Sequence, residues 1–113
     1  MKTLYHCSAW KLLADAEIGQ EYTLIPGRQC AEGLGVYFSE GKPRPQSSDS
    51  CVLSGMTAII AIEVSDEEGW WISKLGKSKK FGKPRTWHSE GKSVSIRVDK
   101  IEDGVLHCSW RWL

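Results

Sequence analysis

The sequence contains no apolar run as long as the roughly 20 residues that a membrane-spanning helix needs. Its N-terminal segment, MKTLYHCSAW, lacks the continuous apolar stretch and the small-residue cleavage site of a secretory signal peptide. From these two absences we expect a cytoplasmic protein that makes no contact with a membrane.

Charge of one sign is also scarce, and the cysteines lack the spacing of a metal or redox motif. The formal net charge is only +1, which argues against a generic polyanion-binding domain. The four cysteines include no CxxC pair, so neither a zinc ribbon nor a redox motif is indicated. Two His-Cys pairs, at 6–7 and 107–108, would each offer only one ligand to a given site, because neighbours in a strand point to opposite faces. We therefore expect no metal site.

The composition is typical of one globular domain spanning residues 1–113. Apolar residues make up 41% of the chain and charged residues 26%, which argues against wholesale disorder. Six tryptophans are many for 113 residues. We expect most of them to pack in the core and one or two to line a pocket that stacks a planar ring.

The order of apolar and turn-forming segments predicts an α+β domain. One helix is expected over 9–18, with Ser8 as N-cap and Gly19 just after its end. The run MTAIIAIEV (56–64) predicts a central strand buried on both faces. Loops are expected over 21–35, 39–50 and 75–85, and a turn over 99–104. The expected fold is a mixed or antiparallel six-stranded split sheet with one or two short helices, its strands over 3–7, 36–39, 56–64, 70–74, 93–98 and 105–113.

Two short segments carry the functional signal, LYHCS around His6 and GLGVYFSE around Tyr37. The glycines before Tyr37 would let the backbone approach a ligand closely. Tyr37 and Phe38 are neighbours in an expected strand, so one should face inward and the other the opposite side.

Together the two segments resemble the ADP-ribosyltransferases of the diphtheria-toxin and poly(ADP-ribose) polymerase type, in particular a small phage- or toxin-like member. That family has a His in a pattern like YHG[ST] and a Tyr in a pattern like GxYF. The resemblance implies an NAD pocket, in which His6 holds ribose hydroxyls and the amide end of NAD and Tyr37 stacks on the nicotinamide ring. It also implies that the Cys7 backbone bonds the carboxamide and that Ser8 matches the family's hydroxyl residue.

The resemblance further implies a catalytic carboxylate at the start of a later strand. Loss of nicotinamide passes through an oxocarbenium-like state, which a nearby carboxylate stabilises. Lys92 precedes the matching segment SVSIRV, so the nearest candidate is Glu90. The family also has a helix after its Tyr motif, where this chain has a Pro- and Ser-rich stretch.

A basic, aromatic segment over 74–92 precedes that strand. The plain interpretation is a solvated charged loop. In the family, this position helps to select the acceptor, which suggests a nucleic acid or a nucleic-acid-binding protein as the target. The expected target contacts are Lys77, Lys79, Lys80, Lys83 and Trp87.

Three functions remain open at this stage. The first is NAD-dependent mono-ADP-ribosyl transfer to a macromolecule. The second is a non-catalytic binding or inhibitor protein that uses the basic segment 74–92. The third is an NAD-dependent RNA 2′-phosphotransferase, which would need a set of Arg and His residues that has no clear counterpart here.

Overall fold

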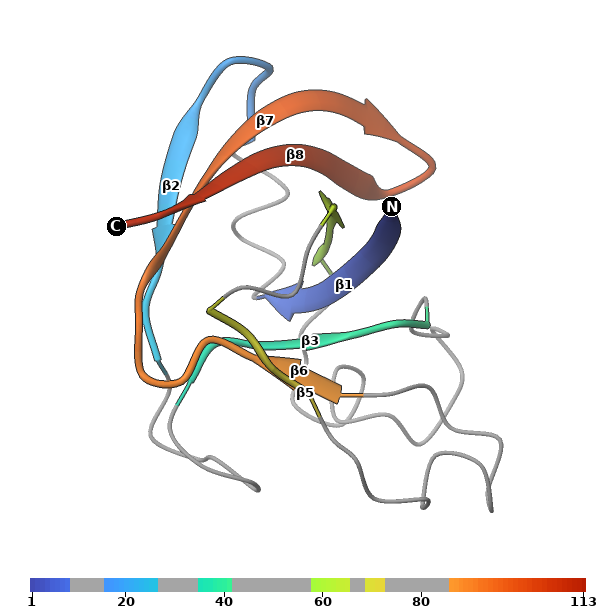
Figure 1. Ribbon diagram of the computed structural model, residues 1–113. Coiled ribbons are helices and arrows are strands. Elements are labelled where there is room, and N and C mark those ends of the chain that lie inside the picture. Colours follow the sequence, from blue (N-terminus) through green and yellow to red (C-terminus); the bar gives the residue numbers. More distant parts are fainter. Residues whose placement is uncertain (9–15, 27–34, 42–57, 66–68, 73–85) are drawn as a thin grey trace.

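The computed structural model describes residues 1–8, 16–26, 35–41, 58–65, 69–72 and 86–113, and within these ranges the chain forms strands and no helix (Figure 1). All the strands belong to one eight-stranded sheet. Their bounds are β1 Lys2–Ser8, β2 Glu21–Leu24, β3 Tyr37–Ser39, β4 Ala58–Val64, β5 Trp71–Ile72, β6 Thr86–His88, β7 Val94–Glu102 and β8 Val105–Trp112.

The sheet is mixed, with the strand order β2-β7-β8-β4-β1-β3-β6-β5. β4 and β8 are parallel, and the other neighbouring strands are antiparallel. The expectation of an α+β fold with a six-stranded sheet is therefore wrong, and of the two sheet types left open, mixed or antiparallel, the structure has the mixed one. The two strands that the sequence analysis missed are β2 and β6.

The expected helix over 9–18 falls mainly on residues 9–15, which lie outside the described residues. Its last part, residues 16–18, is not helical. Gly19 has the positive φ expected of it, 91°. However, its N–H donates to the carbonyl of Val98 on β7, so Gly19 belongs to the turn that leads into β2.

β2 and β6 were missed because both are short and flanked by turn-forming residues. Tyr22 and Leu24 alternate with exposed neighbours along β2, which pairs with β7 at the sheet edge. Thr86–His88 follows the lysine-rich segment, yet it pairs with β3 on one side and β5 on the other. In both cases pairing with a neighbouring strand stabilises a segment that is too short to stand out in the sequence.

The expected turn over 99–104 is also shorter in the structure. β7 continues to Glu102 with a bulge between Val98 and Lys100, and only Asp103 and Gly104 turn the chain into β8. Both have positive φ, 52° and 74°, as a two-residue Asp-Gly hairpin turn requires.

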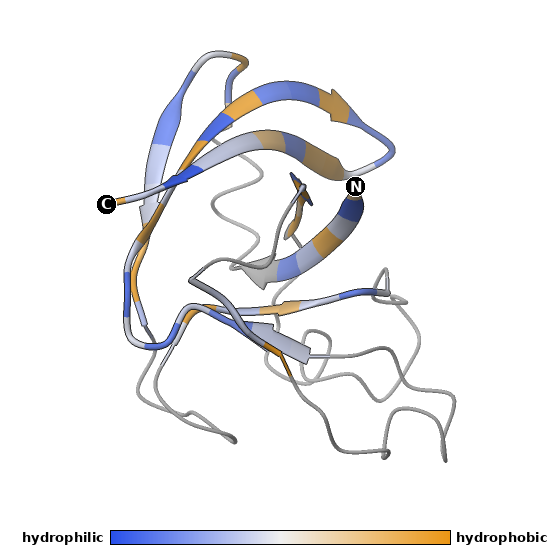
Figure 2. Cartoon of the chain, viewed as in Figure 1, coloured by the Kyte–Doolittle hydropathy of each residue, from blue (hydrophilic) through white to orange (hydrophobic). Residues whose placement is uncertain are grey.

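β4 confirms the expectation of a central buried strand. It lies between β1 and β8. Ile60, Ala61 and Ile62 are consecutive and each is at most 3% exposed, so β4 is covered on both faces there. Hydrophobic and hydrophilic positions alternate instead along β7 and β8, in keeping with one inner and one outer face (Figure 2).

The sheet curls strongly around an aromatic core. β7 and β8 arch over one side, while β3, β6 and β5 lie on the opposite side (Figure 1). Trp70, just before β5, bridges the two sides: its ring lies 5.3 Å from Phe38 and 4.6 Å from Trp112, centroid to centroid. Trp87 and Trp110 also contact it, so the expected core role of most tryptophans is confirmed for the described ones.

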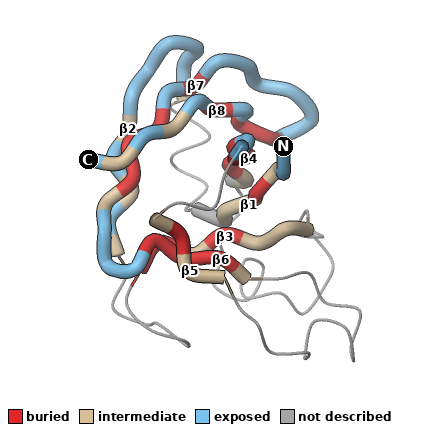
Figure 3. Tube along the Cα trace, viewed as in Figure 1, coloured by how far each residue is buried: buried red, intermediate tan, exposed pale blue. Residues whose placement is uncertain are grey.

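Strands β3, β5 and β6 carry no fully exposed position, whereas β2, β7 and β8 each include exposed positions (Figure 3). The described part of the chain includes no helix long and apolar enough to cross a membrane.

Candidate functional site

The two motif segments lie side by side where β1 and β3 separate. The only paired residues between these strands are Tyr5 and Ser39, although β1 continues to Ser8 and β3 begins at Tyr37. Beyond that pair, the main chain of β1 stays fully paired with β4 on its other side. β1 and β3 thus pair at a single position in the middle of β1, and no main-chain pairing joins His6, Cys7 or Ser8 of β1 to Tyr37 or Phe38 of β3. We call this unpaired stretch between the two strands the opening.

His6 bridges the two strands at this opening. Its ring Nδ1 lies 2.6 Å from the carbonyl oxygen of Tyr37. A carbonyl only accepts, so Nδ1 carries the hydrogen. Burial lowers the pKa of His6, although the bond to the Tyr37 carbonyl opposes the shift. In the neutral ring, Nε2 is then a hydrogen-bond acceptor, which suits a ligand hydroxyl.

The side chains of His6 and Tyr37 nevertheless point to opposite faces of the sheet. With Tyr5 opposite Ser39 in antiparallel strands, His6 falls opposite Phe38 and Cys7 opposite Tyr37. The 5.2 Å separation of the His6 and Phe38 ring centroids agrees with this register. Phe38 is 2% exposed and Tyr37 is half-buried, so the expectation that they face opposite sides is confirmed. The structure joins His6 and Tyr37 through the Tyr37 carbonyl and not through one shared face.

On the Tyr37 face, the structure assembles an aromatic row that the sequence analysis missed. His88 lies directly across from Tyr37 on β6, and Trp71 lies across from His88 on β5. The His88 ring is 5.1 Å from Tyr37 and 4.5 Å from Trp71, on which it stacks at 15°. The signal in the sequence was the WH pair before Ser89, but only the pairing of β6 with β3 shows that it continues the Tyr37 row.

Gly35 fits closely against this row. A Cβ at position 35 would lie 2.9 Å from Nδ1 of His88 and 3.0 Å from the backbone nitrogen of Ser89. The glycines before Tyr37 were expected to let the backbone approach a ligand closely. At Gly35 the backbone does make a close approach, but to His88 and Ser89 of the protein itself. Ser89 also holds the segment before Tyr37 against the turn after β6. Its Oγ accepts from the N–H of Val36 at 2.8 Å and donates to the carbonyl of Lys92 at 2.6 Å.

Glu90, the candidate catalytic carboxylate, lies in the turn after β6. It is exposed with a φ of 51°, and its backbone N–H donates to Nδ1 of His88 at 3.0 Å. The main chain of Glu90 is therefore hydrogen-bonded to His88 of the aromatic row. Its carboxylate makes no hydrogen bond or ion pair with any residue that the structure describes. Lys92, at the position where the resemblance would place a carboxylate, donates to the carbonyl of Gly69 and lies 4.7 Å from the Trp112 ring.

The remaining expected site residues divide into three groups. Cys7 and Ser8 end β1, and only their main chain, paired with β4, is described. Trp87 is 1% exposed and packs against Trp70, which is a core position, and its expected contact with a target stays a prediction. The lysines expected to contact the target lie outside the described residues: Lys77, Lys79, Lys80 and Lys83.

We expect the stability of the protein to fall in mildly acidic solution because of His6. Its pKa is lowered in the folded state, so below about pH 6.5 the unfolded chain takes up a proton that the folded chain resists. Down to the folded pKa, the free energy of unfolding should lose about 1.4 kcal/mol per pH unit. Above about pH 6.5 this contribution is constant.

Urea denaturation of the His6→Asn variant from pH 8 to pH 5 checks this. Asn keeps an N–H donor but does not titrate, so part of the slope below about pH 6.5 should disappear. The matched control is His107→Asn, which makes the same substitution at an exposed histidine on β8. The same pH slope in His6→Asn as in the unaltered protein would contradict the assignment.

Comparisons with protein-family models, curated proteins and solved structures found no match to this chain.

Proposed function

We propose that this protein binds NAD at the opening between β1 and β3, with the nicotinamide ring against Tyr37, and that it transfers ADP-ribose to a macromolecular acceptor. The sequence resemblance of LYHCS and GLGVYFSE to ADP-ribosyltransferases is the reason for naming NAD. The observation that carries the proposal is the hydrogen bond from Nδ1 of His6 to the Tyr37 carbonyl, at the point where main-chain pairing of β1 with β3 ends.

Three features of the opening suit such a ligand. Tyr37 is half-buried, so part of its ring is accessible to a planar partner. The Tyr5–Ser39 register, continued along the strands, places Cys7 across the opening from Tyr37, and we assign the carboxamide to the Cys7 main chain. His6 acts from the opposite face of the sheet, where its Nδ1 holds the Tyr37 carbonyl and so fixes the strand that carries the ring. Next to these three features, His88 packs beside Tyr37, and Trp71 stacks on His88.

Transfer requires more than binding, and Glu90 is the residue that we assign to it. Its main-chain bond to His88 ties the Glu90 turn to the aromatic row. A carboxylate at this turn would stabilise positive charge that develops on the ribose as nicotinamide leaves. The acceptor is proposed to be a nucleic acid or a nucleic-acid-binding protein, because of the lysines in the segment 74–92.

One observation favours a second function, a binding or inhibitor protein without catalysis. Lys92 stands where a catalytic carboxylate would be expected, and its ammonium group binds the Gly69 carbonyl and lies over the Trp112 ring. The carboxylate of Glu90 contacts no described residue. In this alternative the segment 74–92 binds the partner, and no nicotinamide is released.

Replacing Tyr37 by Ala should weaken NAD binding by about fivefold or more, since stacking on an aromatic ring contributes about 1–3 kcal/mol. Tyr37→Phe is the matched control: it retains the ring and should bind nearly as well as the unaltered protein. Isothermal titration calorimetry with NAD measures both. Equal NAD affinity of Tyr37→Ala and the unaltered protein, or no NAD binding at all, would overturn the proposal.

Nicotinamide release separates transfer from binding alone. Glu90→Gln should bind NAD normally and release nicotinamide at least about a hundredfold more slowly. Glu63→Gln is the control, because Glu63 is an exposed glutamate on β4. If the unaltered protein binds NAD but releases no nicotinamide with any acceptor offered, the non-catalytic alternative is supported.

A further inference from the structure

A second polar site lies on the outer face of β2, β7 and β8, away from the opening between β1 and β3. The three strands line a shallow, open hollow of about 300 Å³. Its lining combines Ile96 and Trp110 with five polar or charged residues, Glu21, Ser95, Arg97, Ser109 and Arg111.

Strand pairing brings two arginines together in this hollow. Arg97 lies opposite Ser109, and Ser95 lies opposite Arg111. Arg97 and Arg111 are therefore diagonal neighbours on one face of a strand pair, within reach of a shared ligand. Ser95 is 7% exposed and lines the hollow between them.

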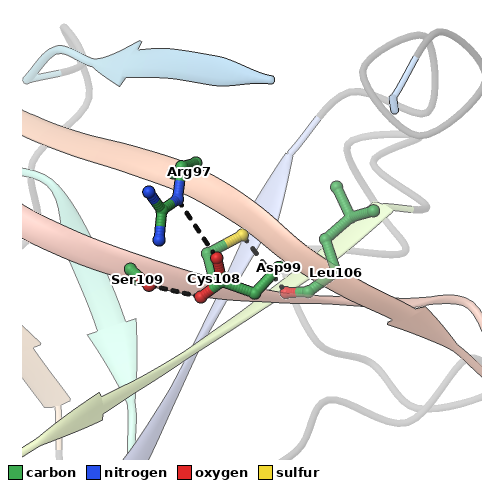
Figure 4. Close-up of polar contacts among 5 residues, drawn as sticks. All are labelled: Arg97, Asp99, Leu106, Cys108 and Ser109. Carbon is green, nitrogen blue, oxygen red and sulfur yellow. Dashed lines mark hydrogen bonds and ion pairs between the residues drawn. The ribbon is translucent and has the colours of Figure 1, made fainter. Parts of the chain in front are cut away.

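Asp99 orients the Arg97 guanidinium. One carboxylate oxygen of Asp99 accepts from Nε of Arg97 at 3.2 Å, and the other accepts from the Ser109 hydroxyl (Figure 4). The hydroxyl bond, with the nearby Arg97 charge, lowers the pKa of Asp99, which keeps it ionised. The bulge between Val98 and Lys100 places Asp99 on β7 for these bonds.

These bonds leave the arginine donors available for a ligand. The two terminal nitrogens of Arg97 are not used by Asp99 (Figure 4). Within the described part of the chain, neither they nor the guanidinium of Arg111 make a hydrogen bond. A guanidinium group presents paired N–H donors, which suit the oxygens of a phosphate group.

We propose that this hollow binds a single phosphate group of a small molecule, held by the terminal nitrogens of Arg97 and by Arg111. We expect a small ligand and not a nucleic acid backbone, because the net charge of the chain is only +1 and polyanion-binding domains usually carry a large basic surplus. Glu21 stands on β2 directly opposite Arg97 and opposes the binding of any anion, so the two arginines must outweigh it.

Binding of inorganic phosphate and of AMP, measured by calorimetry at low ionic strength, tests the site. Arg111→Gln should weaken both ligands by about tenfold or more, since it removes a charge-assisted pair. Glu21→Gln should strengthen both, because it removes the negative charge that faces the ligand. Lys100→Gln is the matched control: it removes one positive charge from β7 outside the hollow, at a residue paired with Glu102, and should leave binding unchanged.

Two further ligands show whether the hollow recognises the phosphate group of a small molecule, its nucleoside part or a nucleic acid backbone. Adenosine should not bind, and a short single-stranded oligonucleotide should bind no more tightly than AMP. Failure of both phosphate and AMP to bind would overturn the proposal. Equal weakening by Arg111→Gln and Lys100→Gln, or binding of the oligonucleotide alone, would do so as well. Tyr37→Ala should leave phosphate binding intact, so the outcome here is independent of the proposed NAD function.

Discussion

Replacing Trp70 by Ala should reduce the free energy of unfolding by about 3–5 kcal/mol, the usual cost of truncating a buried aromatic residue. Trp70 is 7% exposed and bridges the two sides of the curled sheet. Its ring contacts Phe38 and Trp87 on one side and Trp110 and Trp112 on the other. Since domains of this size are stable by roughly 5–15 kcal/mol, the variant should be close to unfolding at 37 °C.

Two neighbouring substitutions make this test specific. Trp71→Ala removes an equally large ring that is half-buried on edge strand β5 and stacks on His88, so it should cost much less. Trp70→Phe should also cost less than Trp70→Ala, because Nε1 of Trp70 is buried without a hydrogen-bond partner among the described residues. Guanidinium denaturation followed by circular dichroism measures all three. A loss in Trp70→Ala no larger than in Trp71→Ala would show that Trp70 does not bridge the sheet.

Replacing Ser89 by Ala should cost about 2–3 kcal/mol of folding stability, although it deletes only one oxygen atom. Ser89 is completely buried. Its hydroxyl accepts from the Val36 N–H and donates to the Lys92 carbonyl. Val36 lies just before β3 and Lys92 just before β7, so the hydroxyl joins the starts of these two strands. Without it, a buried N–H is left unsatisfied, and burial of an unpaired donor is expensive.

Ser95→Ala is the matched control for Ser89→Ala. Ser95 is a serine of similar burial on β7 whose hydroxyl makes no hydrogen bond to a described residue, so its loss should cost under about 1 kcal/mol. Thermal and urea unfolding of the two variants give the comparison. If Ser89→Ala is no less stable than Ser95→Ala, the proposed role of the hydroxyl is wrong.

The sequence was sufficient to predict the elements whose own residues determine them. β4 was predicted because its apolar run is strand-length and rich in β-branched residues, and β8 because its residues alternate. β2 could have been predicted from the alternation of Tyr22 and Leu24, but the Pro-Gly pair that follows it indicated a loop. The Asp103-Gly104 pair likewise is a recognisable turn signal, but the turn predicted from it, 99–104, was too long.

The remaining features depend on contacts between distant segments. β6 has three residues after a lysine-rich stretch, and it becomes a strand because Trp87 is buried between Phe38 on β3 and Trp70 before β5. The same pairing places His88 beside Tyr37, so the aromatic row was invisible in the sequence. The hydrogen bond between His6 and the Tyr37 carbonyl joins positions 31 residues apart, and no local pattern specifies it.

The position of β8 in the sheet constrains how the protein can form during synthesis. β8 follows every other strand in the chain, yet it lies between β7 and β4 in the sheet. It therefore connects the β2-β7 part to the part that contains β4, β1 and β3. On the ribosome these two parts cannot join until residues 105–112 have emerged, so the aromatic core and its unpaired strand edges stay open to chaperones until then.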